Sequence, residues 1–175
     1  MTDPMSKPTI VIVRAGRDQL PEVQRLAGVI WRAHYPGIIT APQIDYMLAR
    51  GYALDVLERF LDAPDRGLEL AMVGNVMAGF AAWYVTGNRA EAKLDKLYVL
   101  QASQRHGLGG RLISHVAGLA QAAGAATLIL NVNKQNVQAV RAYEKHGFAI
   151  REAAVVDIGH GYVMDDYVMA RKIGG

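Results

Sequence analysis

The feature of this sequence that most constrains its fold is a short apolar strand that runs into a glycine-rich turn and then into an amphipathic helix. The strand segment ends at Val99, and the turn contains Gly107, Gly109 and Gly110. Apolar residues then recur at helical spacing until Gly124, which is a helix stop signal. Backbone N–H groups and the positive end of the helix dipole meet at such a turn, and glycines let a phosphate approach the backbone. The segment therefore predicts an anion-binding site.

The remaining patterns predict strands and helices that alternate along the chain. We expect strands over residues 9–13, 68–73, 76–86, 92–100, 127–132, 148–158 and 162–171. We expect helices from a cap at Asp18 up to His34, from Pro42 onwards, and over residues 53–61, 107–123 and 136–146. This order predicts one α/β (α+β) domain over residues 1–175, with a mixed, mostly antiparallel central sheet of about seven strands flanked by helices.

Composition excludes several classes of function. The sequence has no cysteine, which excludes disulfides, thiolate metal sites and a cysteine nucleophile, and we expect no metal. Residues 1–8 are polar, and no apolar run approaches the roughly 20 residues that span a bilayer, so we expect a cytoplasmic protein without a membrane partner. The net charge is +3, and the basic residues are scattered, so we expect no nucleic-acid partner.

Two common phosphate-binding motifs do not fit the glycine-rich turn. A P-loop requires a lysine and a hydroxyl residue after its last glycine, and the turn is followed by Arg111 and Leu112 instead. A dinucleotide fingerprint requires glycine or alanine at its sixth position, where this sequence has Leu112, and an acidic residue near the end of the next strand. That strand ends in Asn131-Val132, so the second motif fails as well.

The turn does resemble motif A of the GNAT acyltransferase superfamily, which has the pattern Gln/Arg-x-x-Gly-x-Gly/Ala. The matching residues are Gln104, Arg105, His106, Gly107, Leu108 and Gly109, preceded by the strand Leu97-Tyr98-Val99. A second segment is similar to motif B of the same family, in which an Asn and an Ala open a helix, a Tyr follows and the motif ends in Gly-Phe. Its residues here are Asn136, Ala139, Tyr143, Gly147 and Phe148.

The resemblance implies that the protein binds acetyl-CoA as its co-substrate. In the family the pantetheine arm lies between two splayed strands, and the pyrophosphate lies on the backbone N–H groups of motif A. The residues implied in acetyl-CoA binding are Leu97, Tyr98, Val99, Gln104, Arg105, His106, Gly107, Leu108, Gly109, Gly110, Arg111, Asn131, Asn136, Ala139 and Tyr143. Two alternatives stay open, because Asn136 is also a suitable helix cap and Tyr143 is also a suitable packing residue.

The implied reaction is direct attack of an amine on the thioester. Tyr143 is the implied general acid for the leaving sulfur. Family members often take the base from a carboxylate on the strand before motif A, where this sequence has Glu91 and Asp95. Strand alternation predicts that both carboxylates and Lys93 lie on one face. A solvated surface role is an open alternative for each carboxylate.

The acceptor amine is suggested by two further segments, residues 31–39 and 159–169. Both are similar to segments of the PaiA-like polyamine acetyltransferases, which implies an acceptor such as spermidine or spermine, although the basic net charge fits a polycation poorly. The candidate acceptor-binding residues are Trp31, His34, Tyr35, Tyr84 and Asp166. A peptide or protein amine, an amino acid or a xenobiotic amine, and a non-catalytic acetyl-CoA sensor remain alternatives. A homodimer through the terminal hairpin is a further open expectation.

Overall fold

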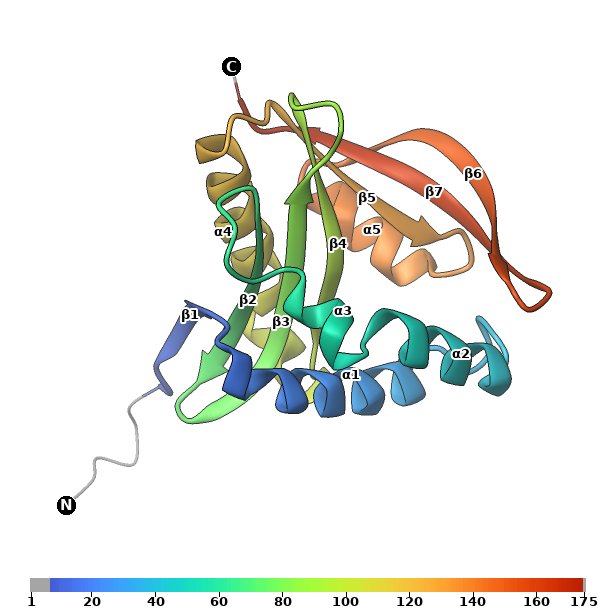
Figure 1. Ribbon diagram of the computed structural model, residues 1–175, viewed down its shortest axis with the longest axis horizontal. Coiled ribbons are helices and arrows are strands. Elements are labelled where there is room, and N and C mark those ends of the chain that lie inside the picture. The colour runs from blue at the N-terminus through green and yellow to red at the C-terminus, as the bar shows by residue number, and fades with distance from the viewer. Residues whose placement is uncertain (1–6, 175) are drawn as a thin grey trace.

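The centre of the computed structural model, which describes residues 7–174, is a seven-stranded sheet with the order β1-β2-β3-β4-β5-β7-β6 (Figure 1). Residues 1–6, which contribute to the prediction of a cytoplasmic protein, lie outside the described residues. The strands are β1 (Ile10–Arg14), β2 (Arg66–Val73), β3 (Val76–Val85), β4 (Glu91–Val99), β5 (Thr127–Asn133), β6 (Ala149–Gly159) and β7 (Tyr162–Lys172). The predicted mixed, mostly antiparallel sheet is confirmed, because only β4 and β5 pair in parallel.

The helices cover both faces of this sheet (Figure 1). They are α1 (Leu20–His34), α2 (Ala41–Gly51), α3 (Leu54–Glu58), α4 (Leu108–Ala122) and α5 (Val137–Lys145), with two 3₁₀ helices, η1 (Arg17–Gln19) and η2 (Gln101–His106). One buried cluster joins α1, α2 and α3 to the sheet, and a second joins α4 to the opposite face. No helix in residues 7–174 combines the length and the apolar character that a bilayer crossing requires.

Two of the predicted helix boundaries are wrong. Asp18 lies inside η1 instead of capping a helix, and α1 begins only at Leu20, because the backbone N–H of Gly16 already donates to the side chain of Gln19 at 2.9 Å and closes a separate turn. The helix expected over residues 53–61 is shorter, because the chain continues from α3 in 3₁₀-type hydrogen bonds and then turns at Asp62, whose φ is +60°.

Strands β4 and β5 share only the start of their length. Three residue pairs join them, from Glu91 opposite Thr127 to Lys93 opposite Ile129. Beyond these pairs β4 stays on β3 while β5 stays on β7, so the two strands diverge and leave a gap in the sheet (Figure 1). Within residues 7–174, the backbone groups of β4 and β5 that face this gap have no partner strand, so they can pair with an extended ligand.

A one-residue irregularity in β4 decides which side chains face which layer. In the pairing with β3, Leu94 lies opposite Trp83 and Lys96 lies opposite Ala82, so Asp95 is an extra residue. Such a bulge shifts the alternation of side chains by one position. As a result Leu94 and Leu97 both pack on the α4 side, although they are three residues apart. Tyr98 packs instead against the α1 side, next to the open end of the gap.

Candidate active site

The N-terminus of α4 presents free backbone donors beside the end of β4. Gly107 occupies the N-cap position with φ +70°, in the left-handed region that favours glycine, and no side chain of the described residues caps the helix. The first helical hydrogen bond runs from the N–H of Arg111 to the carbonyl of Gly107 at 3.1 Å. The N–H groups of Leu108, Gly109 and Gly110 therefore lack helical acceptors and point out of the helix, where they suit a phosphate.

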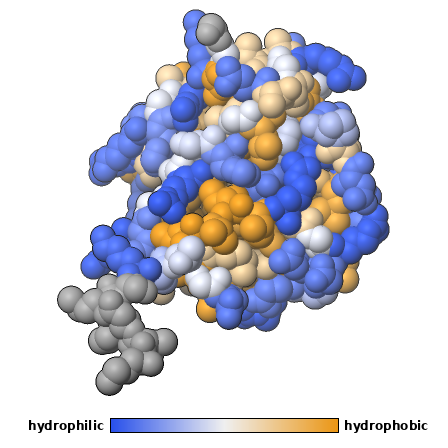
Figure 2. All heavy atoms as spheres, turned by 90° about the vertical axis from the view of Figure 1, so that its left-hand side faces the viewer, coloured by the Kyte–Doolittle hydropathy of each residue, from blue (hydrophilic) through white to orange (hydrophobic). Residues whose placement is uncertain are grey.

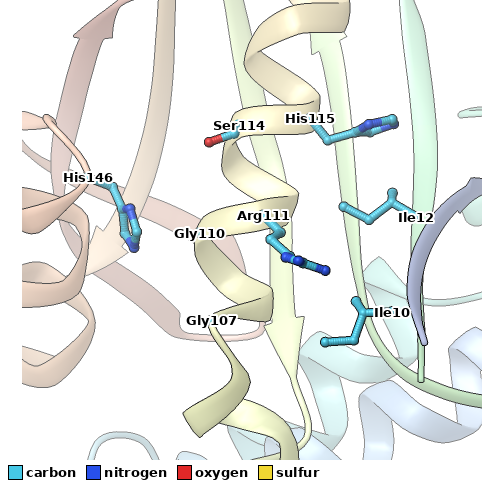
Figure 3. Close-up of a pocket in the computed structure, with 8 residues that line it drawn as sticks. All are labelled: Ile10, Ile12, Gly107, Gly110, Arg111, Ser114, His115 and His146. Atoms are coloured by element: carbon cyan, nitrogen blue, oxygen red, sulfur yellow. The ribbon is translucent and has the colours of Figure 1, made fainter. Parts of the chain in front are cut away.

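A hollow of about 630 Å³ follows this first turn of α4 (Figure 3). It is lined by Ile10, Ile12, Gly107, Gly110, Arg111, Ser114, His115 and His146. Arg111 and His115 extend from α4 towards the two isoleucines of β1, whereas Ser114 points to the side on which His146 lies (Figure 3). On the same side of the molecule, an apolar patch lies among polar side chains (Figure 2).

Gly110 lies where α4 approaches the side chain of His146 at the end of α5. A Cβ atom on this residue would lie 2.6 Å from the ring carbon Cε1 of His146, which is far inside van der Waals contact. Ser114, His115 and His146 were missed in the sequence analysis. Helical spacing was an available signal for the first two, because Ser114 lies four residues after Gly110 and His115 lies four residues after Arg111.

The side chains expected to contact the pantetheine arm surround the gap between β4 and β5. Gln104 donates from Nε2 to the carbonyl of Val99 at 3.3 Å, so it holds the turn that follows β4. Asn131 is exposed on β5. Asn136 is buried and accepts a hydrogen bond from the N–H of Ala139 at 3.4 Å, so it serves as the N-cap of α5.

Tyr143 lies on α5 and packs, half-buried, against the α4-side cluster. Its ring meets the ring of Phe148 edge to face, with centroids 5.8 Å apart. Burial raises the pKa of the Tyr143 hydroxyl well above its usual value of 10, and the charge of an ionised Tyr35 would raise it further. The hydroxyl is therefore protonated at neutral pH, as a general acid must be.

Aromatic side chains form the wall on the opposite face of the gap. The hydroxyl oxygens of Tyr35 and Tyr98 share a hydrogen bond of 3.0 Å. Burial raises the pKa of both hydroxyls, and that of Tyr98 most strongly. Trp31 is only 5% exposed and donates from Nε1 to the hydroxyl of Tyr52 at 3.1 Å, so it belongs to the core behind this wall. His34 stacks edge to face on Tyr35, with ring centroids 4.9 Å apart.

The structure does not bring the other predicted residues to the open end of the gap. Glu91 lies at the closed end and pairs with Arg151 at 2.7 Å. Asp95 is placed between two ammonium groups, those of Lys96 at 2.9 Å and Lys93 at 3.9 Å.

Tyr84, the remaining aromatic acceptor candidate, lies opposite Lys93 in the sheet and packs near Phe60, with ring centroids 6.5 Å apart. It therefore lies near the closed end too, because Lys93 belongs to the last residue pair that joins β4 to β5.

Asp166 lies on β7 opposite Asn133 of β5, and it is only 5% exposed. Within residues 7–174, its oxygen Oδ1 has no hydrogen-bond partner. Nearby, a second hollow of about 240 Å³ separates the segment between α1 and α2 from the end of β5. Its lining is Ile38, Ile39, Thr40, Gln43, Asn133, Gln135, Val163 and Asp165.

Comparison with known proteins agrees with this geometry. Residues 30–148 match the Acetyltransferase (GNAT) family, which is more than half of the chain. The chain is 31% identical over 114 residues to "Uncharacterized N-acetyltransferase Rv2669" of Mycobacterium tuberculosis, covering 65% of this chain and 72% of that protein. It is 28% identical over 149 residues to "Probable N-acetyltransferase Rv2775" of the same organism, covering 82% and 83%.

Solved structures share the fold. The PaiA N-acetyltransferase of Thermoplasma acidophilum, solved in complex with coenzyme A, superposes with a TM-score of 0.79 at 21% identity and covers 94% of this chain and 99% of its own. An acetyltransferase of the GNAT family from Staphylococcus aureus gives a TM-score of 0.72 at 16% identity, covering 94% and 99%. The sheet, the gap and the free helix terminus thus define an acyltransferase that uses acetyl-CoA. The chain belongs to the GNAT acetyltransferase family.

Proposed function

We propose that this enzyme transfers the acetyl group of acetyl-CoA to a primary amine by direct attack, in the gap between β4 and β5. The observation that carries the proposal is the gap itself, beside which the N-terminus of α4 offers free N–H groups. Tyr143 of α5 packs against the same buried cluster as α4. The thioester of acetyl-CoA supplies an activated acetyl carbonyl. Because the sequence contains no cysteine, the chain offers no thiol to take the acetyl group first.

The residues present fit coenzyme A. Gly107 caps α4 with a positive φ and, within the described part of the chain, without a side-chain hydrogen bond, so the first backbone N–H groups of the helix can reach a pyrophosphate directly. Arg111 adds a positive charge beside the hollow that follows. The unpaired edges of β4 and β5, at Leu97 to Val99 and at Asn131, suit the amide groups of a pantetheine arm.

Tyr143 is the proposed general acid for the leaving sulfur. Its raised pKa keeps the proton on the hydroxyl until a thiolate develops, and the half-buried position limits competition from water. Glu91 and Asp95 stay predictions for the base, and the ion pairs that they form with Arg151 and Lys96 weigh against both.

Polyamines are the first acceptors to test. The proposal of spermidine or spermine rests on the similarity of residues 31–39 and 159–169 to PaiA-like enzymes, and the shared fold with a PaiA acetyltransferase is consistent with it. Against it, the carboxylates Asp95 and Asp165 are paired with lysines, so few negative charges are free to receive a polycation. A peptide amine, an amino acid or a xenobiotic amine are the alternative acceptors.

The test is release of free coenzyme A thiol from acetyl-CoA in the presence of pooled polyamines, amino acids, peptides and aminoglycosides. We expect release with at least one pool, and a loss of about 100-fold or more in kcat for Tyr143→Phe. Tyr46→Phe is the matched control, because this tyrosine lies on α2 outside residues 31–39 and 159–169, and the variant should keep wild-type activity. Tight binding of acetyl-CoA without transfer to any pool would instead favour a sensor.

A further inference from the structure

Three carboxylates of β4 and β7 differ in their partners. The carboxylate of Asp165 pairs with Lys134 at 2.6 Å, and that of Asp95 pairs with Lys96 at 2.9 Å. Asp166 is buried, and its Oδ1 atom has no hydrogen-bond partner among residues 7–174. A buried carboxylate oxygen without a partner costs free energy. The cost is offset when a ligand supplies the missing positive group.

The position of Asp166 suits such a ligand. In the register of β7 with β5, Asp166 lies opposite Asn133 and two positions from Asn131, so it shares a sheet face with these two residues of the strand that borders the gap. Burial raises the pKa of the Tyr35 hydroxyl, and the negative charge of Asp166 raises it further, so the carboxylate lies within electrostatic range of the wall formed by Tyr35 and Tyr98.

The charged surroundings favour a carboxylate that gains and loses a proton. Burial raises the pKa of Asp166 above its usual value, and the neighbouring charge of Asp165 acts in the same direction. Asn131, Lys93 and Lys134 lower that pKa and partly offset the effect. A carboxylate with a raised pKa is a stronger base than an ordinary surface aspartate.

We propose that Asp166 receives the ammonium group of the acceptor and takes its proton, which makes the enzyme selective for amines that are charged when they bind. This inference rests on the proposed function. It assigns the base to β7 instead of to Glu91 or Asp95 of β4.

The proton balance of this step is complete. One N–H bond of the acceptor ammonium breaks, and its proton forms an O–H bond on Asp166. The neutral amine then forms the C–N bond to the acetyl carbonyl, and the C–S bond breaks as sulfur takes the hydroxyl proton of Tyr143. The tyrosinate recovers a proton from the new amide nitrogen, and Asp166 releases its proton to solvent.

The test compares acceptors that differ in charge. Ethylamine and spermidine are cationic at neutral pH, whereas hydroxylamine is mostly uncharged and needs no base. For Asp166→Asn we expect kcat/KM to fall by about 100-fold or more with the cationic probes, and by less than tenfold with hydroxylamine. Glu152→Gln is the matched control, because this carboxylate is 59% exposed on β6, and it should react like wild type with every probe.

The pH profile supplies a second readout. Without the base, only the neutral amine reacts, so the loss for Asp166→Asn with ethylamine should shrink as the pH rises towards an amine pKa of about 10. Equal losses with charged and uncharged probes would overturn the inference, as would wild-type enzyme that uses hydroxylamine but neither cationic probe. Wild-type enzyme that acetylates no amine while it binds acetyl-CoA would contradict the proposed function itself.

Discussion

Replacement of Asp166 by asparagine should stabilise the protein at neutral pH, whatever the acceptor is. The side chain is 5% exposed, and Oδ1 is unpartnered within the described residues. Burial of the ionised carboxylate therefore costs desolvation free energy, and a neutral amide at this position would cost less. An unsatisfied buried polar group costs roughly 1–3 kcal/mol. Because Asn131 and Lys93 offset part of this cost, we expect Asp166→Asn to gain about 1 kcal/mol.

The sign of the pH dependence follows from the raised pKa. The pKa of Asp166 in the folded state lies above its ordinary value of 3.8, so the native state binds the proton more tightly than the unfolded state does. The carboxylate therefore destabilises the protein above its folded-state pKa, and this cost disappears as the pH falls to the unfolded-state value. The difference in free energy of unfolding between Asp166→Asn and wild type should therefore decrease as the pH falls.

Thermal unfolding, followed by circular dichroism at a series of pH values, measures this difference. We expect a melting temperature about 2–4 °C above wild type at neutral pH, which corresponds to the gain of about 1 kcal/mol in a chain of this size. Asp165→Asn is the control, because this aspartate is 55% exposed and paired with Lys134, and it should give no gain. A loss of stability in Asp166→Asn at every pH would show that the carboxylate is satisfied, and the reasoning would fail.

Two further predictions concern the cofactor turn and the core. Gly107→Ala places a Cβ atom at φ +70° and should cost about 1 kcal/mol of stability and weaken acetyl-CoA binding in calorimetry; unchanged affinity would contradict the role of this turn. Glu69 is 1% exposed and accepts hydrogen bonds from Arg14 at 2.9 Å and Trp83 at 3.3 Å. Glu69→Ala should therefore destabilise the protein by roughly 3 kcal/mol in urea unfolding, and a change below 1 kcal/mol would argue against a buried network.

The sheet and its flanking helices could be predicted because the local signals agree with the tertiary structure. Gly124 and Gly147 both follow helices and both have positive φ, as their use as stop signals predicts. The gap between β4 and β5 was predicted only through the resemblance to motif A and motif B, because strand pairing depends on contacts that local patterns do not encode. The bulge at Asp95 was missed, although two consecutive polar residues, Asp95 and Lys96, interrupt the alternation between Leu94 and Leu97.

The sequence did not predict which charged side chains form ion pairs with one another. Glu91 and Arg151 are 60 residues apart, so nothing local indicates that they form an ion pair. Asp165 and Asp166 are neighbours in sequence, yet one is paired at the surface and the other is buried without a partner for Oδ1 among residues 7–174. Alternation along β7 predicts opposite faces for the two residues. That Asp166 shares its face with Asn131 and Asn133 follows only from the register with β5.

Mass spectrometry with deuterium-labelled acetyl-CoA tests the central claim most directly. Protein, labelled acetyl-CoA and the pooled amines are incubated together, and the masses of both the acceptors and the intact protein are followed over time. Direct transfer predicts that an amine gains one labelled acetyl group while the mass of the protein stays unchanged. Label that accumulates on the protein before it reaches an amine, or that appears only as free acetate, would contradict transfer by direct attack in the gap between β4 and β5.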